Sequence, residues 1–219
     1  MTKKTHGTPD KSGEKPTKEK ILDAAIDLFA QNGFDAVSMQ DIAQTVGIKK
    51  ASLYYYFVSK DQLLKEILEY PITRIGAVGP KGVETEELIT SLGADGFLTM
   101  SGGIFLNWMK DEKMQKVWRI LCIELYHNDQ IKKFYANFRA MSVSFWESNF
   151  NLMLKHKLIK NIDPKVLVNE YLSYFMEANL NYFIYSYGNT PNSFEQEYKD
   201  LFNQHTKFIV DSIKLEESA

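Results

Sequence analysis

Residues 38–60 contain the side chains of this sequence that are best suited to recognise another molecule. Lys49, Lys50, Tyr54 and Tyr55 fall within one short stretch of it. Lysine ammonium groups bind phosphate and donate to base edges, and tyrosine combines a hydroxyl with a flat ring. On the outer face of a short helix, such residues are typical of a helix that enters the major groove of DNA. Nucleic-acid binding is therefore the first hypothesis.

Two short helices around a glycine are expected to position these side chains. Ser38 is a good N-cap for the first helix, and Asp41 stands where a near capping box requires a partner. Gly47 is predicted to end this helix, because glycine enters the left-handed region at little cost. The second helix is predicted over residues 49–56, with Leu53 on its inner face. This is a helix-turn-helix pattern, although short helix pairs are also common as mere packing units.

The flanks of the pattern sharpen its interpretation. They contribute, in order, the segments Ile21–Ala30, Gly33–Phe34, Asp41–Ala43, Leu53–Phe57 and Ser59–Leu64. In residue type and spacing these segments resemble the DNA-binding domain of the TetR family of bacterial and archaeal repressors. The resemblance covers roughly a fifth of the chain. The remaining residues resemble the family only in being helical.

The resemblance implies which side chains meet DNA. Lys50 and Ala51 stand where the family contacts bases, and Tyr54 and Tyr55 where it contacts phosphates and base edges. Lys50 could donate to guanine, and the Ala51 methyl could contact a thymine methyl. The full predicted DNA-binding set is Ser38, Gln40, Lys49, Lys50, Ala51, Ser52, Tyr54, Tyr55, Tyr56 and Lys60.

Part of this set is expected to contact the DNA backbone and set the register. These residues are Ser38, Gln40, Tyr56 and Lys60. Lys60 begins a further helix, which Ser59 is predicted to cap with Gln62 as its capping-box partner, and it resembles the phosphate-contacting lysine of the family. For Tyr56, packing in the core is an equally weighted alternative. Lys49 stands where the family often has Ser or Thr, so a phosphate contact is expected there in place of a side-chain cap.

The whole chain sets further bounds. Its 219 residues suffice for a small DNA-binding domain and one larger domain. The formal net charge is only -2, so phosphate contacts must come from a local group of lysines. Cys122 is the only cysteine, which excludes an internal disulfide and suits a reducing, cytoplasmic location. No apolar run of about 18 residues and no signal peptide are apparent, so no membrane contact is expected.

The apolar spacing predicts an all-α fold of about nine helices. We expect a flexible tail over residues 1–16, a three-helix DNA-binding domain over 17–62, and a helical ligand-binding and dimerisation domain over 63–219. A helix over residues 60–75 is expected to join the two domains, as it does in the family.

The C-terminal helices are rich in aromatic and methionine side chains. An ordinary core explains any one of them most simply, but their density favours a pocket for an apolar or aromatic molecule. Gly102 and Gly103 weaken a predicted helix and could mark a kink or an opening. Glu177 is expected to be buried and to need a partner, either a cationic ligand group or a nearby Tyr or His. The predicted pocket set is Phe97, Met100, Phe105, Trp108, Trp118, Leu121, Phe138, Met141, Phe145, Tyr174 and Glu177.

A helix predicted over residues 163–187 is apolar on all sides in its second half. Such a helix must be buried all round, so we expect one face to pack inside and another on a second copy of the chain. With the last helix, residues 193–215, it could form a four-helix bundle across a two-fold axis, as in TetR-family dimers. The predicted interface set is Tyr171, Phe175, Tyr182, Phe183, Phe202, Phe208 and Ile209.

Together these features predict a ligand-responsive transcriptional regulator. As a homodimer it would bind a palindromic operator in double-stranded DNA, most simply as a repressor that a small apolar or aromatic effector releases. Activation stays open. One alternative is a ligand-binding helical protein without a DNA-binding role, against which the intact lysines and tyrosines argue. Another is a small acid–base enzyme that uses Glu124 and His127, although a solvated pair explains these residues more simply. No catalytic residue, metal site or cofactor is predicted.

Overall fold

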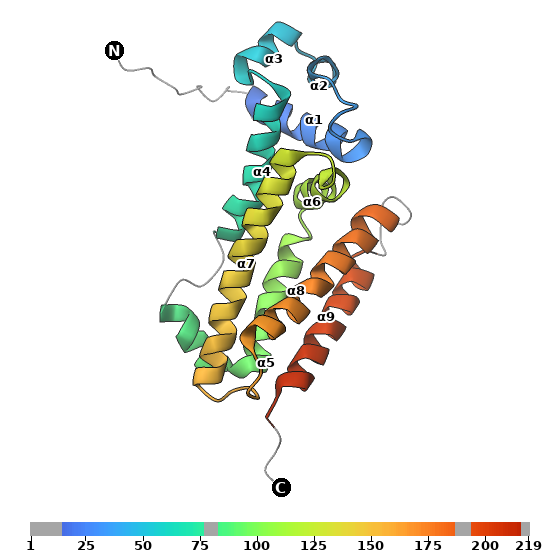
Figure 1. Ribbon diagram of the computed structural model, residues 1–219. Helices are drawn as coiled ribbons and strands as arrows, with labels where there is room; N and C mark the ends of the chain where they lie inside the picture. The colour runs from blue at the N-terminus through green and yellow to red at the C-terminus, as the bar shows by residue number, and fades with distance from the viewer. Residues whose placement is uncertain (1–14, 77–82, 187–193, 216–219) are drawn as a thin grey trace, which may run out of the picture. The chain divides into compact units, whose positions relative to one another are not determined.

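A computed structural model describes residues 15–76, 83–186 and 194–215 of the chain (Figure 1). Within these ranges all regular elements are helices and no strand is present, so the predicted all-α class is confirmed. The chain divides into two compact units, Met1–Ile67 and Leu68–Ala219. The sequence-based boundary after residue 62 falls slightly earlier. The predicted tail lies almost wholly outside the described residues.

The N-terminal unit consists of three helices and the start of a fourth. Its core contains Ile21, Phe29, Ile42, Leu53 and Phe57, all fully buried. These apolar residues recur at the spacing of one helix face, which explains why the short helices pack together. The elements are α1 (Thr17–Asn32), α2 (Met39–Val46), α3 (Lys50–Tyr56) and α4 (Lys60–Gly76).

The predicted signals at both ends of α2 are confirmed. The backbone N–H of Asp41 donates to Ser38 Oγ at 3.2 Å, and the Asp41 carboxylate accepts from the Ser38 N–H at 2.8 Å. This is a complete capping box. Gly47 follows α2 with a φ of 76°, in the left-handed region where a side chain would be strained. Lys49 occupies the N-cap of α3 without a side-chain cap, as expected.

Helix α4 starts with a variant of the predicted capping box. Ser59 Oγ accepts from the Gln62 N–H at 3.1 Å, as expected. The Gln62 side chain, however, accepts from the N–H of Val58 at 2.9 Å and not from that of Ser59.

Further along, Pro71 lies inside α4. Proline has no N–H, so the helix lacks one backbone hydrogen bond just after the division between the two units.

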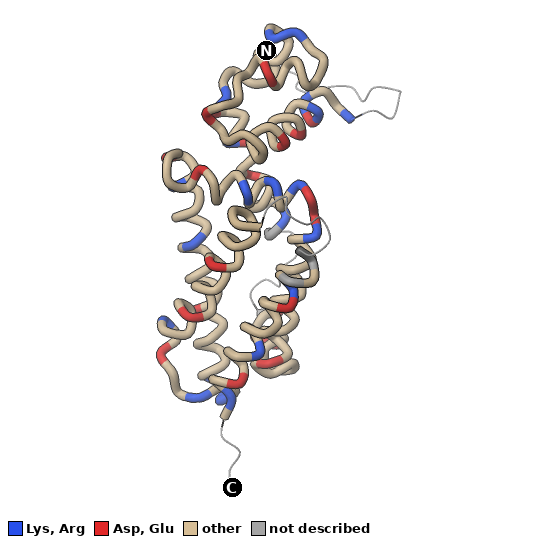
Figure 2. The backbone as a smooth tube through the Cα atoms, turned by 90° about the vertical axis from the view of Figure 1, so that its right-hand side faces the viewer, with Lys and Arg blue, Asp and Glu red and all other residues tan. Residues whose placement is uncertain are grey.

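The C-terminal unit is a bundle of long helices (Figure 1). Helices α5 and α8 each pack against both α7 and α9, and α6 packs against a short π-helix, η1. Basic and acidic residues are interspersed along these helices (Figure 2). The elements are α5 (Val83–Trp108), α6 (Glu112–Glu124), α7 (Asp129–Lys155), α8 (Pro164–Leu180), η1 (Asn181–Tyr185) and α9 (Phe194–Ile213).

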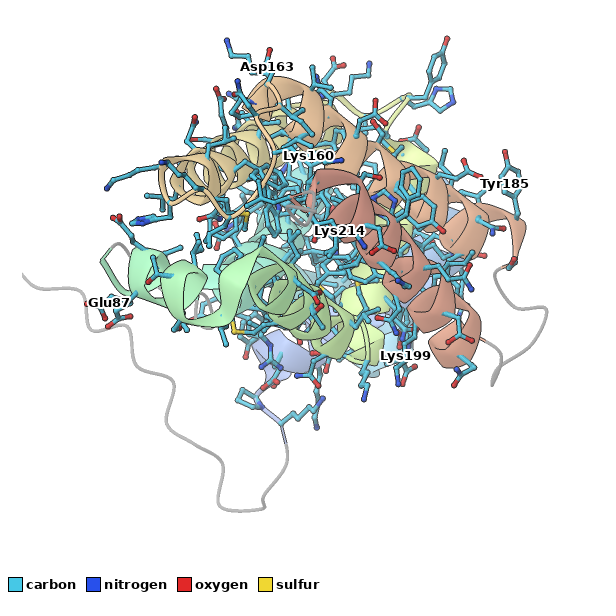
Figure 3. All side chains as sticks on the ribbon, turned by 90° about the horizontal axis from the view of Figure 1, so that it is seen from below. Glu87, Lys160, Asp163, Tyr185, Lys199 and Lys214 are labelled. Carbon is cyan, nitrogen blue, oxygen red and sulfur yellow. The ribbon has the colours of Figure 1, made fainter. Side chains whose placement is uncertain are left out.

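One end of this bundle is tied together by the backbone. The N–H of Lys160, which follows α7, donates to the carbonyl of Ile213 at the end of α9, at 2.8 Å. Lys160 and Lys214 accordingly lie close together in the end-on view of Figure 3. Helix α8 starts at Pro164, next to the predicted start at residue 163, and the side chain of its N-cap Asp163 accepts from the N–H of Lys165.

The α-helical part of the predicted helix 163–187 is shorter than expected. It ends at Leu180 and continues as the π-helix η1, where the guanidinium of Arg119 donates to the carbonyl of Phe183. Such π-segments are rare and need extra support for their backbone groups. The predicted end of this helix, at residues 187–188, lies outside the described residues.

The glycines of α5 affect the helix in different ways. Gly93 interrupts it, with a φ of 69° and a ψ of 179°. Gly102 and Gly103, in contrast, do not kink the helix. A β-carbon at Gly102 would overlap the ring of Phe202 on α9, so this glycine permits the close approach of α5 and α9. Of the two expectations for these glycines, the kink was wrong, whereas the opening is supported at Gly103, which lines the cavity described below.

Helix α5 is also the most apolar element of the described chain. By length and composition, Glu84–Trp108 could cross a membrane, with a mean hydropathy of 1.2 in its most apolar window. A core helix meets the same criterion. In the structure, α5 is interrupted at Gly93 and packs against α7 and α9, and 22% of the apolar window is buried.

Candidate DNA-binding surface and ligand cavity

Helix α3 carries most of its predicted DNA-binding side chains on the outside of the N-terminal unit. Leu53 is fully buried, as is Phe57 directly after the helix, and together they anchor it. Tyr55 is 85% exposed, and Tyr54 is also exposed. The remaining exposed residues of this face are Lys49, Lys50, Ala51 and Ser52. Amines, a hydroxyl and two phenols are thus displayed together on a rigid helix.

Tyr56 lies at the edge of this surface and not in the core. Its side chain is 36% exposed, and its ring meets that of Tyr55 edge to face, with centroids 5.4 Å apart. The core-packing alternative for Tyr56 is therefore wrong. A DNA contact from Tyr56 stays a prediction.

Lys60 is held inside the unit. Its ammonium donates to the carbonyls of Phe34 at 2.7 Å and Val37 at 2.9 Å, and it lies 4.2 Å from the centre of the Phe34 ring. These bonds tie the start of α4 to the loop before α2. An ammonium has three donors, so one remains for a phosphate. Lys60 thus has a structural role in addition to its predicted one, and Lys60→Ala would confound folding with DNA binding.

Ser38 and Gln40 differ in how available their side chains are for a contact with DNA phosphate. The hydroxyl of Ser38 donates to Asp41 at 2.7 Å and accepts from its N–H, so it is used within the capping box. The same hydrogen bonds, from the side chain and then the backbone of Ser38, lower the pKa of Asp41. Gln40 is half-buried. Both residues stay predictions as phosphate contacts, and Ser38 has a demonstrable role in shaping α2.

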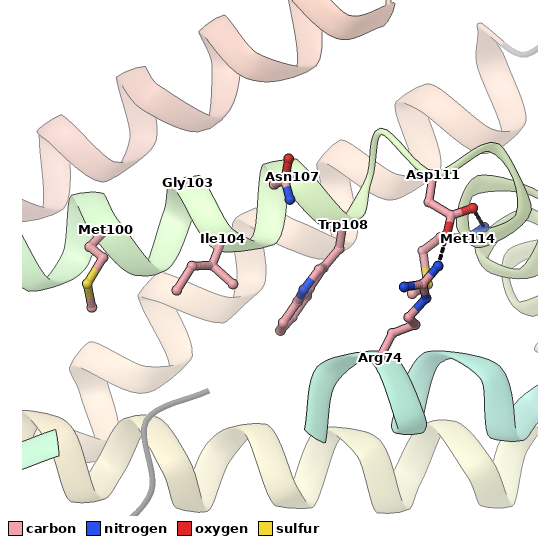
Figure 4. Close-up of a pocket in the computed structure, with 8 residues that line it drawn as sticks. All are labelled: Arg74, Met100, Gly103, Ile104, Asn107, Trp108, Asp111 and Met114. Atoms are coloured by element: carbon pink, nitrogen blue, oxygen red, sulfur yellow. Dashed lines mark hydrogen bonds and ion pairs between the residues drawn. The ribbon is translucent and has the colours of Figure 1, made fainter. Parts of the chain in front are cut away.

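The C-terminal unit contains a cavity of about 550 Å³. Its wall is formed by α5, with contributions from α4 and the start of α6 (Figure 4). A volume of this size is typical of small-molecule sites. The lining residues are Arg74, Met100, Gly103, Ile104, Asn107, Trp108, Asp111 and Met114.

Only Met100 and Trp108 of the predicted pocket set line this cavity. Several others belong to the protein's own packing. Phe97, Trp118 and Leu121 are buried core residues, and Phe105 stacks on Phe202 with centroids 5.7 Å apart. Two more rings of the set pack on other side chains: Phe138 on Trp118, and Tyr174 on His205.

Three members of the predicted pocket set are exposed. Met141 and Phe145 were expected to face inward from α7, but the inner positions of its second half are taken by Trp146 and Phe150. Glu177 is likewise exposed and not buried among apolar residues. Each expectation assumed the wrong helix face, because the side of α7 or α8 that is covered depends on the neighbouring helices.

The polar end of the cavity is a hydrogen-bond network that the sequence analysis missed. Asp111 Oδ2 accepts from the Tyr70 hydroxyl at 2.5 Å and from Arg74 Nη2 at 3.2 Å. Asp111 Oδ1 accepts from the N–H groups of Lys113 and Met114, which caps α6. An N-cap role for Asp111 is readable from sequence. Its partners on α4 are not, because they lie far away in the chain.

The charge state of Asp111 follows from these contacts. Burial acts to raise its pKa, but the hydrogen bonds from Tyr70 and from the N–H groups of Met114 and Lys113 lower the pKa below its usual value. Burial and the bond to Asp111 together raise the pKa of Tyr70. Asp111 is therefore a carboxylate and Tyr70 a neutral donor near neutral pH.

The predicted dimer-interface set divides into three groups by exposure. Tyr171, Phe183, Phe202 and Ile209 are buried within a single chain, so their assignment to an interface was wrong. Phe175 and Tyr182 are half-buried. Phe208, by contrast, is 66% exposed, and Tyr185, which was not in the set, is 70% exposed and points away from the helices (Figure 3).

Known proteins share parts of this chain. Residues 21–67, which include α2 and α3, match the family described as bacterial regulatory proteins, tetR family. The match spans 47 of the 219 residues of the chain and lies within the N-terminal unit. Over 52 residues, the chain is 44% identical to the biofilm operon icaADBC HTH-type negative transcriptional regulator IcaR of Staphylococcus epidermidis. The match covers 24% of this chain and 28% of the length of IcaR.

Two solved structures resemble the chain over nearly its whole length. A putative transcriptional regulator from Saccharomonospora viridis in complex with choline matches with a TM-score of 0.65 and 18% identity, over 91% of this chain and 98% of the other. SmeT in a complex with triclosan matches with a TM-score of 0.65 and 15% identity, over 92% and 93%. These likenesses establish the fold alone, a helix-turn-helix N-terminal unit followed by a helical C-terminal unit.

The enzyme alternative receives no support from the tetR-family match, since that family and IcaR are regulatory proteins. Glu124 is buried, whereas His127 is exposed beside the ring of Tyr126. The two side chains therefore lie in different environments. Burial raises the pKa of the Cys122 thiol to about 12, which makes it a poor nucleophile. Among the described residues, no group of His, Cys, Asp and Glu is arranged to hold a metal ion.

Proposed function

We propose that this protein is a ligand-responsive transcriptional regulator that binds a palindromic operator as a homodimer. The observation that carries the proposal is the exposed face of α3, which displays Lys49, Lys50, Tyr54 and Tyr55 on a tetR-family helix-turn-helix unit. Helix α3 would enter the major groove, with Lys50 donating to base edges and Lys49 to phosphate.

Dimerisation is supported by large apolar side chains that are exposed on η1 and α9 of the C-terminal unit. Tyr185 on η1 and Phe208 on α9 are both exposed. Covering them with a second copy would remove apolar surface from water. A two-fold dimer presents two copies of α3, and it would therefore recognise two half-sites related by the same symmetry. The protein would act on DNA in the cytoplasm.

Repression is supported by the similarity to IcaR, which is described as a negative regulator. Control by a small molecule is supported by the cavity and by the ligands bound in similar structures, choline in one and triclosan in the other. The cavity touches Arg74 on α4, the helix that runs from one unit into the other. An effector bound there would bias α4 and depopulate the state that binds DNA.

Fluorescence anisotropy with a DNA fragment from the region upstream of the gene tests the DNA-binding part of this proposal. Lys49→Ala should weaken binding and reduce the slope of log K against log salt by about two, since each phosphate contact contributes about 0.9 and a dimer has two copies. Lys65→Ala is the matched control, because Lys65 is an exposed lysine of the same unit on α4. Equal effects of the two substitutions would contradict the assignment of α3.

A further inference from the structure

The cavity of the C-terminal unit combines an apolar wall with one charged end. Met100, Ile104 and Trp108 extend from α5 on the same side of the helix (Figure 4). Gly103 leaves the wall open, since a β-carbon there would meet no atom within 4 Å. A flat apolar or aromatic body fits such a wall, because it can stack on the indole and contact the flexible thioether. The charged end of the cavity then determines which polar group of the ligand is recognised.

The anionic member of the charged end has no capacity left for a ligand. Each oxygen of the Asp111 carboxylate accepts two hydrogen bonds, from the Tyr70 hydroxyl and Arg74 on one side and from two backbone N–H groups on the other. A carboxylate offers about four lone-pair positions, so Asp111 is saturated. A cationic ligand would have to displace one of these donors.

The cationic member, by contrast, has donors to spare. Arg74 uses Nε and Nη2 for contacts of 3.2 to 3.4 Å with Tyr70 and Asp111, which are long for hydrogen bonds to charged groups. Its Nη1 makes no hydrogen bond to the described residues. The Arg74 side chain is 58% exposed, so it can turn without breaking a strong bond. The amine of Lys113 lies 4.9 Å from the centre of the Tyr70 ring and adds a second positive charge to this end.

We infer that this cavity binds an aromatic molecule that carries a carboxylate group, with Arg74 as the residue that receives the carboxylate. The inference rests on the proposed ligand-binding role of the cavity and adds the chemical class of the ligand. A guanidinium pairs with a carboxylate through two parallel hydrogen bonds, which Nη1 and Nη2 can supply. The ligand would thereby compete with Asp111 for Arg74. Because Arg74 belongs to the last turn of α4, that competition acts directly on the connecting helix.

Three probes of one shape test the preference for an anion: 2-naphthoate, the neutral 2-naphthamide and the cationic 2-naphthylmethylammonium. Isothermal titration calorimetry of the full-length protein should give a dissociation constant about tenfold lower for naphthoate than for the amide, and weakest binding for the ammonium ion. Equal affinities, a preference for the cation, or no binding of naphthoate at millimolar concentration would each overturn the inference.

Substitutions locate the binding site. Arg74→Gln should bring the affinity for naphthoate down to that for the amide, while Arg74→Lys should retain part of the preference. Gly103→Leu should fill the cavity and weaken all three probes without lowering the melting temperature, since its β-carbon has free space. Arg139→Gln, an exposed arginine of α7, is the matched control and should change nothing. Naphthoate binding that survives both Arg74→Gln and Gly103→Leu would lie elsewhere and would contradict the inference.

Operator binding by the unchanged protein, measured without any probe, separates this inference from the proposed function. If the protein does not bind DNA but its affinity for naphthoate still depends on Arg74, the regulator proposal is wrong and the proposed ligand class stands. If DNA binding holds but the carboxylate is not preferred, only the ligand class is wrong.

Discussion

The DNA-binding surface and the cavity are built in opposite ways. On α3, neighbouring residues in the sequence supply an exposed face, and fully buried residues such as Leu53 supply its support. The cavity gathers its lining from three helices, between Arg74 and Met114, and several of these residues also take part in helix packing. On α3, stability and recognition therefore belong to different residues. In the C-terminal unit, the same residues serve both.

The largest effect should come from removing support behind α3. Phe57→Ala deletes a fully buried ring and should destabilise the N-terminal unit by about 3–5 kcal/mol. Tyr55→Ala, at an 85% exposed position, should change stability by less than about 0.5 kcal/mol yet weaken operator binding. Urea unfolding and fluorescence anisotropy measure the two properties. A comparable loss of stability in both variants would break the proposed separation.

The next largest difference in stability is expected between alanine substitutions at two adjacent glycines of α5. Gly102→Ala places a β-carbon against the buried ring of Phe202 and should cost about 1–3 kcal/mol. Gly103→Ala meets no neighbour and should stabilise the helix by up to about 1 kcal/mol. Thermal unfolding of both variants reports the difference. If Gly102→Ala were also stabilising, α5 and α9 would not pack as closely as described.

A smaller effect is expected at the cap of α2. Ser38→Ala removes an acceptor for the Asp41 N–H and should cost about 1 kcal/mol. Ser38→Asn retains a capping side chain and should lose much less. Chemical unfolding followed by circular dichroism gives both values, and an equal loss in the two variants would argue against capping as the cause.

The same cap predicts a pH dependence. The folded-state pKa of Asp41 is lowered by its hydrogen bonds with Ser38, so the carboxylate contributes stability above its unfolded pKa of about 4. That contribution is lost as the pH falls through the folded-state pKa. The wild-type protein should therefore be more stable than Asp41→Asn at pH 7, and the difference should shrink at pH 3. A difference that grows on acidification would reverse the assignment.

The smallest expected effect concerns the Cys122 thiol, which should hardly react in the folded protein. Burial raises the pKa of Cys122 to about 12, so the native thiol should be almost inert to iodoacetamide at pH 8 and should react readily in urea. Mass spectrometry measures the alkylated fraction over time. Rapid alkylation of the native protein would indicate that the C-terminal unit opens more easily than a packed bundle should.

Local signals predicted the helices well. The cap and the glycine end of α2 and the start of α8 near residue 163 each depend on residues within one or two turns, and all were expected from sequence. The face that a long helix buries was predicted less well. Met141 and Phe145 continue an apolar stripe on α7, but Trp146 and Phe150 take the inner positions because Tyr171 of α8 packs there.

By itself, the sequence determined the helix-turn-helix unit, because caps, a glycine turn and a helical apolar stripe act over a few residues. It also determined which side chains α3 displays, since Leu53 and Phe57 fix the orientation of that helix. Only the tertiary structure decided that Tyr70, Arg74 and Asp111 meet at one cavity, and that Tyr171 and Phe202 belong to the core. These contacts join residues far apart in the chain, and no local preference specifies them.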